Sequence, residues 1–348
     1  MTDLLLTCPP GLEDIVELEA KEKIPCASIS KRHMGVRGHV LLHIEDGKYN
    51  ADYMSRVLSM RSIHHVMRYI ASFRIERGKD DALSTIYRNV SALDLGSVLN
   101  SSTRFRVTSE RLGRHEFTSI DVQRASGKAI VDRFSSKVDL KHYDVEVRVD
   151  VIGEQCIVGI ALTRESLHKR GYRVFDHPAA LKASIAYAML RLAEPSEGNI
   201  LVDPMCGSGT IPIEAALSIL GLEIYGFDVN GIYIDYARAN AEHAGVGDRI
   251  RFIQYDCRML DNILTPDRIV TNPPYGVRME PSRGVRRLYL DFARASYRAM
   301  VDRGRVVVIA LKHGMMKDIL SSAGFAIIKD MPVMHGDLWT HVIVGEKR

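Results

Sequence analysis

The residues that can do chemistry gather in the second half of the chain, and the densest group lies at 200–210. Its letters, Ile-Leu-Val-Asp-Pro-Met-Cys-Gly-Ser-Gly-Thr, predict a strand that ends at Asp203, a turn with Gly207 and Gly209, and a helix that begins at Thr210. Glycine lets a ligand approach the backbone closely, and a helix N-terminus offers free N–H groups to an electronegative group. The third glycine of a dinucleotide fingerprint is missing, which disfavours NAD and FAD. A plain strand-to-helix turn is the alternative for this segment alone.

Two further acidic residues follow predicted strands. Asp228 lies 25 residues after Asp203, at the end of 222–227, where an acidic side chain can accept hydrogen bonds from both hydroxyls of a ribose. Asp256 follows 250–255 and is placed to accept from an adenine amino group. Each aspartate alone is typical of a strand-end cap, but three at successive strand ends indicate a nucleoside pocket. The chain has no Gly-Lys-Ser/Thr loop, so the predicted ligand is a nucleoside without phosphate.

A second motif, Thr271-Asn-Pro-Pro-Tyr-Gly276, follows the apolar pair Ile269-Val270. Its two prolines fix the backbone as it leaves the sheet, so that carbonyl groups and the Asn272 side chain project as hydrogen-bond acceptors. Tyr275 supplies a flat ring. This combination is suited to stacking on a planar heterocycle while two acceptors hold its exocyclic amine. A tight proline turn is the alternative if the motif is taken in isolation.

Length and composition narrow the class of protein. The 348 residues suggest two domains, and 46% apolar with 26% charged residues is the composition of a globular protein. No apolar run approaches the roughly 18 residues of a membrane span, and residues 1–9 lack the features of a secretory signal, so we expect a cytoplasmic protein. The five cysteines form no Cys-x-x-Cys pair, and His39 and His43 lie in a stretch that favours a strand, so we expect no metal.

Charge is unevenly distributed along the chain, although the formal net charge is only +4. Residues 51–175 contain 21 Lys and Arg against 15 Asp and Glu, whereas residues 176–348 contain 20 of each kind. A basic excess confined to the first half is compatible with a polyanionic partner. The alternative is an ordinary mixed-charge surface exposed to water.

The elements that must position these residues differ between the two halves. The first half predicts two α+β regions, with strands at 4–7, 40–44, 65–70, 104–108, 145–151 and 157–162 and helices at 12–22, 49–58, 82–90 and 120–134. From residue 179, helices alternate with wholly apolar strands at 200–202, 222–227, 269–270 and 306–311. Such strands are covered on both faces, as in a parallel doubly wound sheet. Strands at 327–334 and 339–344 predict a closing antiparallel hairpin.

Taken together, the motifs resemble those of the S-adenosylmethionine-dependent amino-methyltransferases, in which Asp/Asn-Pro-Pro-Tyr marks transfer to an amine of a base. The stretch Asp203-Pro-Met-Cys-Gly-Ser-Gly-Thr-Ile-Pro-Ile-Glu-Ala215 with Asn272-Pro-Pro-Tyr-Gly276 looks like the THUMP-domain methyltransferases that make N2-methylguanosine in RNA. The resemblance covers the whole chain: 111–117, 119–122 and 126–129 look like the THUMP core, and 167–173 is similar to the family's linker.

The resemblance implies an α/β fold with a C-terminal Rossmann-like methyltransferase domain, whose sheet is doubly wound and mostly parallel, behind an N-terminal α+β region. The implied domains are a ferredoxin-like domain at 1–64, a THUMP RNA-binding domain at 65–163, a linker at 164–177 and the methyltransferase domain at 178–348. We expect a monomer that acts on tRNA without a membrane or metal partner.

The implied activity is S-adenosylmethionine-dependent methylation of the exocyclic N2 amine of a guanosine in tRNA. Relatives acting on position 10 usually carry Asp before Pro-Pro-Tyr, so Asn272 and the Met-Cys-Gly-Ser turn favour position 6 in the acceptor stem. The alternatives are position 10, a guanosine in rRNA, a DNA adenine methyltransferase, and an RNA-binding protein whose methyltransferase half is an inactive scaffold.

The resemblance also assigns roles to individual residues. Asn272 Oδ1 and the Pro273 carbonyl would accept the N–H bonds of the guanine amine, and Tyr275 would stack on the base. The implied cofactor pocket is lined by Ala179, Leu181, Asp203, Pro204, Cys206, Gly207, Gly209, Thr210, Asp228, Val229, Asp256, Cys257 and Asn272. The expected RNA phosphate contacts are Arg111, Arg114, Lys128, Arg170, Arg173, Arg283, Arg286 and Arg287, with Arg278 in the same cluster.

Overall fold

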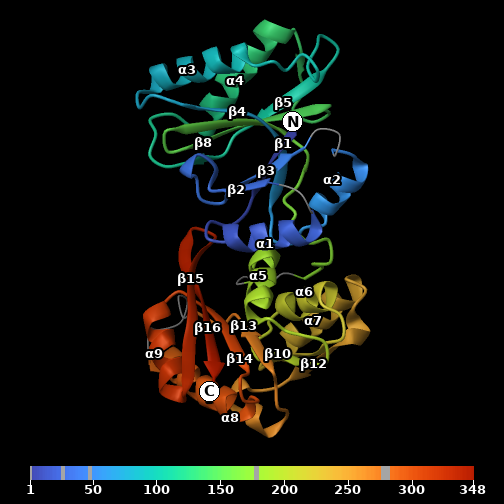
Figure 1. The fold of residues 1–348 in the computed structure, drawn as a ribbon, viewed down its shortest axis with the longest axis vertical. Coiled ribbons are helices and arrows are strands. Elements are labelled where there is room, and N and C mark those ends of the chain that lie inside the picture. Colours follow the sequence, from blue (N-terminus) through green and yellow to red (C-terminus); the bar gives the residue numbers. More distant parts are fainter. Residues whose placement is uncertain (1, 25–27, 46–48, 176–179, 276–282) are drawn as a thin grey trace. The chain divides into compact units, whose positions relative to one another are not determined.

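The computed structural model describes residues 2–24, 28–45, 49–175, 180–275 and 283–348. They group into an N-terminal unit (residues 1–8 and 16–167) and a C-terminal unit (residues 9–15 and 168–348). Each unit has its own sheet and its own hydrophobic core (Figure 1).

The C-terminal unit is built on a seven-stranded sheet with the order β12-β11-β10-β13-β14-β16-β15. Neighbours among the first five strands of that order are parallel, and β16 and β15 are antiparallel, as the apolar strands and the terminal hairpin predicted. The strands are β10 (Ile200–Asp203), β11 (Glu223–Asp228), β12 (Ile250–Gln254), β13 (Arg268–Thr271), β14 (Arg305–Ala310), β15 (Phe325–His335) and β16 (Leu338–Lys347).

Helices cover both faces of this sheet, which explains why its strands are apolar on both sides. On one face α8 and α9 enclose a core in which Phe292 and Met316 meet Val306 and Val308. Figure 1 shows α5, α6 and α7 on the other side of the strands. The helices are α5 (Ala183–Ala193), α6 (Thr210–Ser218), α7 (Gly231–His243), α8 (Arg283–Ala299) and α9 (His313–Ala323), with 3-10 turns η2 (Gly247–Arg249) and η3 (Cys257–Asn262).

The order of the strands places the candidate site. After β10 the chain moves outwards to β11 and β12, and it then returns to β13 on the other side of β10. Such a reversal leaves a crevice at the carboxyl ends of the two neighbouring strands, where ligands bind in doubly wound folds. Asp203 ends β10 and Asn272 follows β13, so both motifs lie at this crevice.

A short early segment, residues 9–15, belongs to the C-terminal unit. The Pro10 carbonyl accepts a hydrogen bond from the Met334 N–H at 3.0 Å, which covers part of the edge strand β15. Gly11 has a φ of +103°, and a Cβ atom there would lie 2.0 Å from the Pro332 oxygen. Only glycine permits this approach of two backbones.

The linker predicted at 164–177 is fastened to the C-terminal unit by buried polar contacts. Arg170 Nε donates to Glu214, a fully buried residue of α6, at 3.0 Å, and the Tyr172 hydroxyl donates to the same carboxylate at 2.9 Å. Further along, two linker N–H groups donate to the buried Asn240 side chain on α7. These contacts fix the path of the backbone through this polar, Arg-rich segment.

The N-terminal unit contains a nine-stranded sheet with the order β2-β3-β1-β4-β9-β8-β5-β7, and β6 pairs with β8. Its strands are β1 (Thr2–Thr7), β2 (Ser28–Lys31), β3 (His39–Ile44), β4 (His65–Arg74), β5 (Arg104–Thr108), β6 (Arg111–Leu112), β7 (Lys137–Val138), β8 (Val145–Ile152) and β9 (Gln155–Ala161). One sheet runs through both predicted N-terminal domains, because β1 and β4 are paired. The division at residue 64 stays a prediction.

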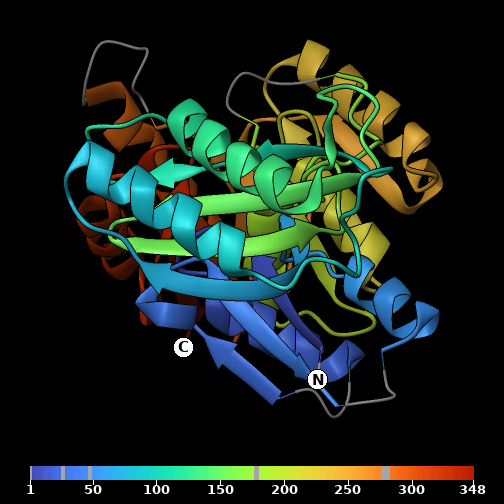
Figure 2. The ribbon, with the colours of Figure 1, turned by 90° about the horizontal axis from the view of Figure 1, so that it is seen from above.

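Figure 2 shows α3 and α4 lying side by side over one face of this sheet. Thr118 begins α4 with a capping box, in which its side chain accepts from the Asp121 N–H and Asp121 accepts from the Thr118 N–H. The helices are α1 (Glu13–Lys23), α2 (Ala51–Leu58), α3 (Lys79–Ala92) and α4 (Ser119–Phe134), with the 3-10 turn η1 (His33–Gly35). Throughout the described ranges, every helix is too short or too polar to cross a bilayer.

Candidate functional site

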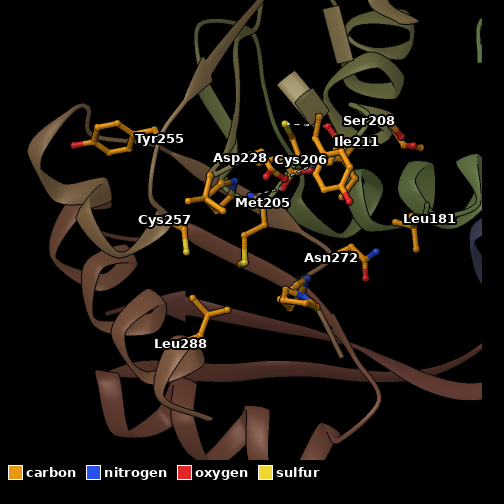
Figure 3. A pocket seen from close by; sticks show the side chains of 18 of the residues that line it. Leu181, Met205, Cys206, Ser208, Ile211, Asp228, Tyr255, Cys257, Asn272 and Leu288 are labelled. Atoms are coloured by element: carbon orange, nitrogen blue, oxygen red, sulfur yellow. Dashed lines mark hydrogen bonds between the residues drawn. The ribbon is translucent and has the colours of Figure 1, made fainter. Parts of the chain in front are cut away.

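A cavity of about 320 Å³ lies at the carboxyl ends of the central strands of the C-terminal unit. This volume is at the lower end of the range for small-molecule sites. Figure 3 shows that the side chains around it come from segments far apart in the chain, among them Leu181, Asp228, Asn272 and Leu288. The fold, not one local segment, therefore assembles the site.

Most residues that the sequence assigned to the site line this cavity. They are Leu181, Asp203, Pro204, Cys206, Gly207, Thr210, Asp228, Val229, Asp256, Cys257, Asn272, Pro273 and Tyr275. Gly209 does not line it: its φ is +84°, and a Cβ atom there would lie 3.0 Å from the Ala237 Cβ and 3.2 Å from the Phe252 ring. The need for glycine at this position therefore comes from packing against α7 and β12. Ala179 lies outside the described residues.

Two aspartates are fixed at the cavity wall by backbone donors. Asp203 accepts from the Met205 N–H at 3.2 Å, and Asp228 accepts from the Gly207 N–H at 3.0 Å. Burial raises the pKa of Asp203 to about 7, and the nearby Asp228 acts in the same direction. Each carboxyl group keeps further acceptor capacity. When ionised, these two acidic groups at one partly open cavity favour a ligand that carries positive charge.

Asp256, which was predicted to meet an adenine amino group, is engaged by its neighbour Arg258. The guanidinium donates to both carboxylate oxygens, at 2.9 and 2.5 Å, and holds the pKa of Asp256 below its usual range. Both side chains line the cavity, so a ligand here meets an ion pair instead of a lone carboxylate. The adenine contact stays a prediction.

The Asn-Pro-Pro-Tyr motif leads from β13 into the cavity wall. Pro273 is buried and Tyr275 is half-buried. The Tyr275 hydroxyl is enclosed and has no hydrogen-bond partner within the described ranges, and burial raises its pKa. The phenol therefore stays uncharged at neutral pH, and the ring offers a stacking surface rather than a base.

Two cysteine thiols, Cys206 and Cys257, also line the cavity. Burial raises the pKa of Cys206 well above its usual range and that of Cys257 to about 12. Such thiols stay protonated at neutral pH, whereas cysteine chemistry requires the thiolate. Neither side chain is therefore an activated nucleophile, which disfavours methyl transfer through a covalent cysteine intermediate.

Several lining residues were missed by the sequence reasoning: Ala180, Met205, Ser208, Ile211, Tyr233, Tyr255, Arg258, Pro274 and Leu288. Met205, Ser208 and Pro274 lie inside the recognised motifs, so reading every motif position as lining would have found them. Leu288 is different, because it lies within α8 and no local pattern distinguishes it from the other apolar residues of that helix.

Of the basic residues expected to contact RNA, Arg286 and Arg287 are exposed on α8, next to Leu288 in the cavity wall. Arg278 and the Arg283 side chain lie outside the described residues. Neither of the first two side chains lines the cavity, and Arg287 pairs with Asp291 at 3.7 Å, so their contact with RNA stays a prediction.

Arg170 and Arg173 are held inside the C-terminal unit. Arg170 forms the ion pair with Glu214, and Arg173 donates to the Leu181 carbonyl and, at 3.0 Å, to the Thr210 hydroxyl. Both guanidinium groups thus fasten the linker. The phosphate contacts expected of them stay a prediction.

In the N-terminal unit, the basic side chains expected to contact RNA differ in whether they already bind other residues of the chain. Arg114 is exposed, while Arg111 donates to the Gly113 carbonyl at 3.2 Å and lies 3.0 Å from His115 Nδ1. Lys128 forms an ion pair with Asp132 one turn along α4. Such exposed pairs are weak and can be exchanged for phosphate.

Three side chains of types that can ligate a metal ion lie together, and none of them lines the cavity: His313, Asp330 and His341. The two imidazole rings stack at 3.7 Å, and His341 Nδ1 is 2.5 Å from Asp330. Lys317 also donates to Asp330, at 2.6 Å, so an ammonium group already neutralises the carboxylate that a metal ion would need. The cluster ties α9 to β15 and β16.

Known protein-family models match a part of each unit. Residues 170–341 match a family model described as "RMKL-like, methyltransferase domain", and residues 81–161 match the THUMP domain. The chain is 33% identical to the tRNA (guanine(6)-N2)-methyltransferase of Methanocaldococcus jannaschii, with 98% of each chain covered. It is 35% identical to the enzyme of that name from Thermus thermophilus, again with 98% of each covered.

Solved structures of similar fold include TrmN from Thermus thermophilus, with a TM-score of 0.80, 32% identity and 100% of both chains covered. SMU.472, solved in complex with SAH, has a TM-score of 0.79 at 20% identity, covering 100% of this chain and 98% of that one. Both likenesses extend over the two units.

Proposed function

The chain belongs to the family of THUMP-domain tRNA (guanine-N2)-methyltransferases, and on this basis we propose that it transfers a methyl group from S-adenosylmethionine to the N2 amine of a guanosine in tRNA. Position 6 is the proposed target, since the relatives matched over nearly their full length carry that position in their names. The observation that carries the proposal is one cavity that joins Asn272 and Tyr275 to Asp203 and Asp228.

When bound, S-adenosylmethionine supplies a methyl group on a positively charged sulfur. The residues present fit this molecule, because the cavity combines acidic groups with apolar walls such as Leu181 and Ile211. Asp228, at the end of β11, would accept hydrogen bonds from the ribose hydroxyls. The Asp203 carboxyl would face the positive charge of the methionine part.

The chain's own contribution to the reaction is mainly to align the groups. Asn272 Oδ1 and the Pro273 carbonyl would accept the two N–H bonds of the guanine amine, which directs its lone pair towards the methyl carbon. Tyr275 would stack on the base. Since the Cys206 and Cys257 thiols stay protonated, the amine itself would be the nucleophile. Its nitrogen would bond to the methyl carbon as the carbon–sulfur bond breaks, the cofactor would leave as a neutral thioether, and the amine proton would leave to solvent.

The RNA is proposed to contact both units. On α8 a groove of about 350 Å³ is lined by Arg286, Arg287 and Arg294 together with Leu290 and Asp291, and Arg287 pairs with Asp291 at 3.7 Å. These arginines are proposed to hold phosphates of the RNA. A guanosine paired in a stem must leave the stack to reach the cavity, at a cost of roughly a few kcal/mol. The basic, THUMP-containing first half supplies the additional binding surface.

The test uses the purified protein, S-adenosylmethionine and tRNA transcripts in which one guanosine is replaced by inosine, which lacks the N2 amine. We expect methylation of the unmodified transcript, loss with inosine at position 6, and full activity with inosine at position 10. Loss with inosine at position 10 would assign that position instead. Absence of transfer despite cofactor binding would support an inactive scaffold.

A further inference from the structure

The loop that carries the two prolines is held by a side chain from α8. The Tyr289 hydroxyl donates a hydrogen bond to the Pro274 carbonyl oxygen at 2.7 Å. Tyr289 is 3% exposed and lies in the core with Phe292 and Ala293, so α8 cannot shift without disturbing packed side chains. Burial raises the pKa of Tyr289 to about 12, and its hydroxyl therefore keeps the proton that it donates.

Most backbone torsions of residues 272–274 are restricted by the prolines themselves. Each proline ring fixes the φ of its own residue. A residue that precedes proline is confined to extended ψ values, which restricts Asn272 and Pro273. Pro274 precedes Tyr275, so its ψ is the torsion that neither rule restricts. This torsion, together with the φ and the side-chain torsions of Tyr275, sets where the Tyr275 ring points.

We propose that Tyr289 is a positioning residue for methyl transfer: through the Pro274 carbonyl, its hydroxyl fixes this last torsion and holds the Tyr275 ring where it stacks on the base. The inference rests on the proposed function. Tyr275 lines the cavity and Tyr289 does not, within the part of the chain that the structure describes. Tyr289 therefore acts through Tyr275.

Tyr289→Phe removes one hydroxyl and keeps the ring. We expect kcat for tRNA methylation to fall about 10-fold, because small misplacements of a reacting pair lower the rate steeply, with KM for both substrates within about twofold. Tyr297→Phe is the matched control, since Tyr297 lies two turns further along α8 and packs against Phe325. It should keep the parent kcat. An unchanged kcat in Tyr289→Phe, or an equal loss in both variants, overturns the proposal.

A double-mutant cycle separates positioning from general damage. If Tyr289 acts through Tyr275, Tyr289→Phe lowers kcat by less than about twofold once Tyr275→Ala is present. A full loss in both backgrounds overturns the proposal.

Amide hydrogen exchange at Tyr275 gives a readout that requires no methyl transfer. We expect faster exchange in Tyr289→Phe than in Tyr297→Phe, because the torsion before Tyr275 is released. Equal exchange overturns the proposal. Faster exchange in a protein whose parent methylates no guanosine would refute the proposed function while supporting the restraint on the loop.

Discussion

At the residue scale, Asn272 offers the side chain that the proposed chemistry depends on most. Asn272→Ala removes one oriented acceptor from the cavity wall, so we expect methyl transfer to fall about 10²-fold while S-adenosylmethionine still binds. Single-turnover kinetics and calorimetric binding measure the two effects separately. Asn262→Ala, at an exposed position at the end of η3, is the control. Parent-like turnover in Asn272→Ala would remove Asn272 from the reaction.

Asp203 predicts a dependence of cofactor binding on pH. Burial raises its pKa to about 7, so the carboxyl is mostly protonated at pH 6 and mostly ionised at pH 7.5. Because only the ionised form attracts a positive ligand, we expect S-adenosylmethionine to bind about tenfold more tightly at pH 7.5 than at pH 6. Calorimetric titration measures this. Asp203→Asn should abolish the dependence, and a variant that keeps the parent's pH profile would point to a different group.

The sequence predicted those site residues whose position follows from the strand immediately before them. It did not predict residues whose role depends on a contact with a distant part of the chain. Asp203, Asp228 and Asn272 follow short apolar strands, so their place at one sheet edge followed from the pattern. The pairing of Asp256 with Arg258 did not follow from the sequence pattern. A carboxylate two residues from an arginine can also face solvent or bind another partner, and the sequence does not distinguish these cases. Tyr289 was invisible in the sequence, since its role depends on a contact across 15 residues.

At the element scale, the spacing of apolar residues predicted the helices and strands that are long and buried. The strand expected at 104–108 coincides with β5, and the helix expected at 120–134 differs from α4 by one residue. The strand β2 has mostly exposed residues, and β6 and β7 are two residues long, so none of them produces an apolar pattern. These short strands form because the longer strands beside them offer backbone N–H and C=O groups for hydrogen bonds.

The linker's ion pair yields a prediction about stability. Arg170→Met leaves the fully buried Glu214 without its guanidinium, so we expect a loss of about 3–5 kcal/mol of unfolding free energy. Arg170→Met with Glu214→Gln should recover more than half, because no buried charge remains. Urea denaturation followed by circular dichroism measures both. A loss below about 1 kcal/mol in the single variant would show that Glu214 stays satisfied without Arg170.

At the scale of the whole molecule, the excess of basic residues lies in the first half of the chain, whereas the cavity residues proposed to carry out methyl transfer lie in the C-terminal unit. Arg111→Glu with Arg114→Glu should weaken tRNA binding and reduce its dependence on salt, since each lost phosphate contact removes roughly one released counterion from the slope. Fluorescence anisotropy with labelled tRNA at several salt concentrations measures the slope. Arg56→Glu, on an exposed position of α2, is the control. A slope that matches the parent would mean that RNA enters by another surface.

The crossing of residues 9–15 into the C-terminal unit sets an order of events during synthesis on the ribosome. Pro10 is synthesised long before Met334 on β15, its hydrogen-bond partner, because most of this sequence lies between them. Residues 9–15, which include the first residues of α1, cannot make this contact until the hairpin of β15 and β16 has been translated. The β15 edge of this sheet is therefore covered only after the hairpin has been synthesised, and a nascent chain that stops before β15 has β14 as its exposed edge strand instead.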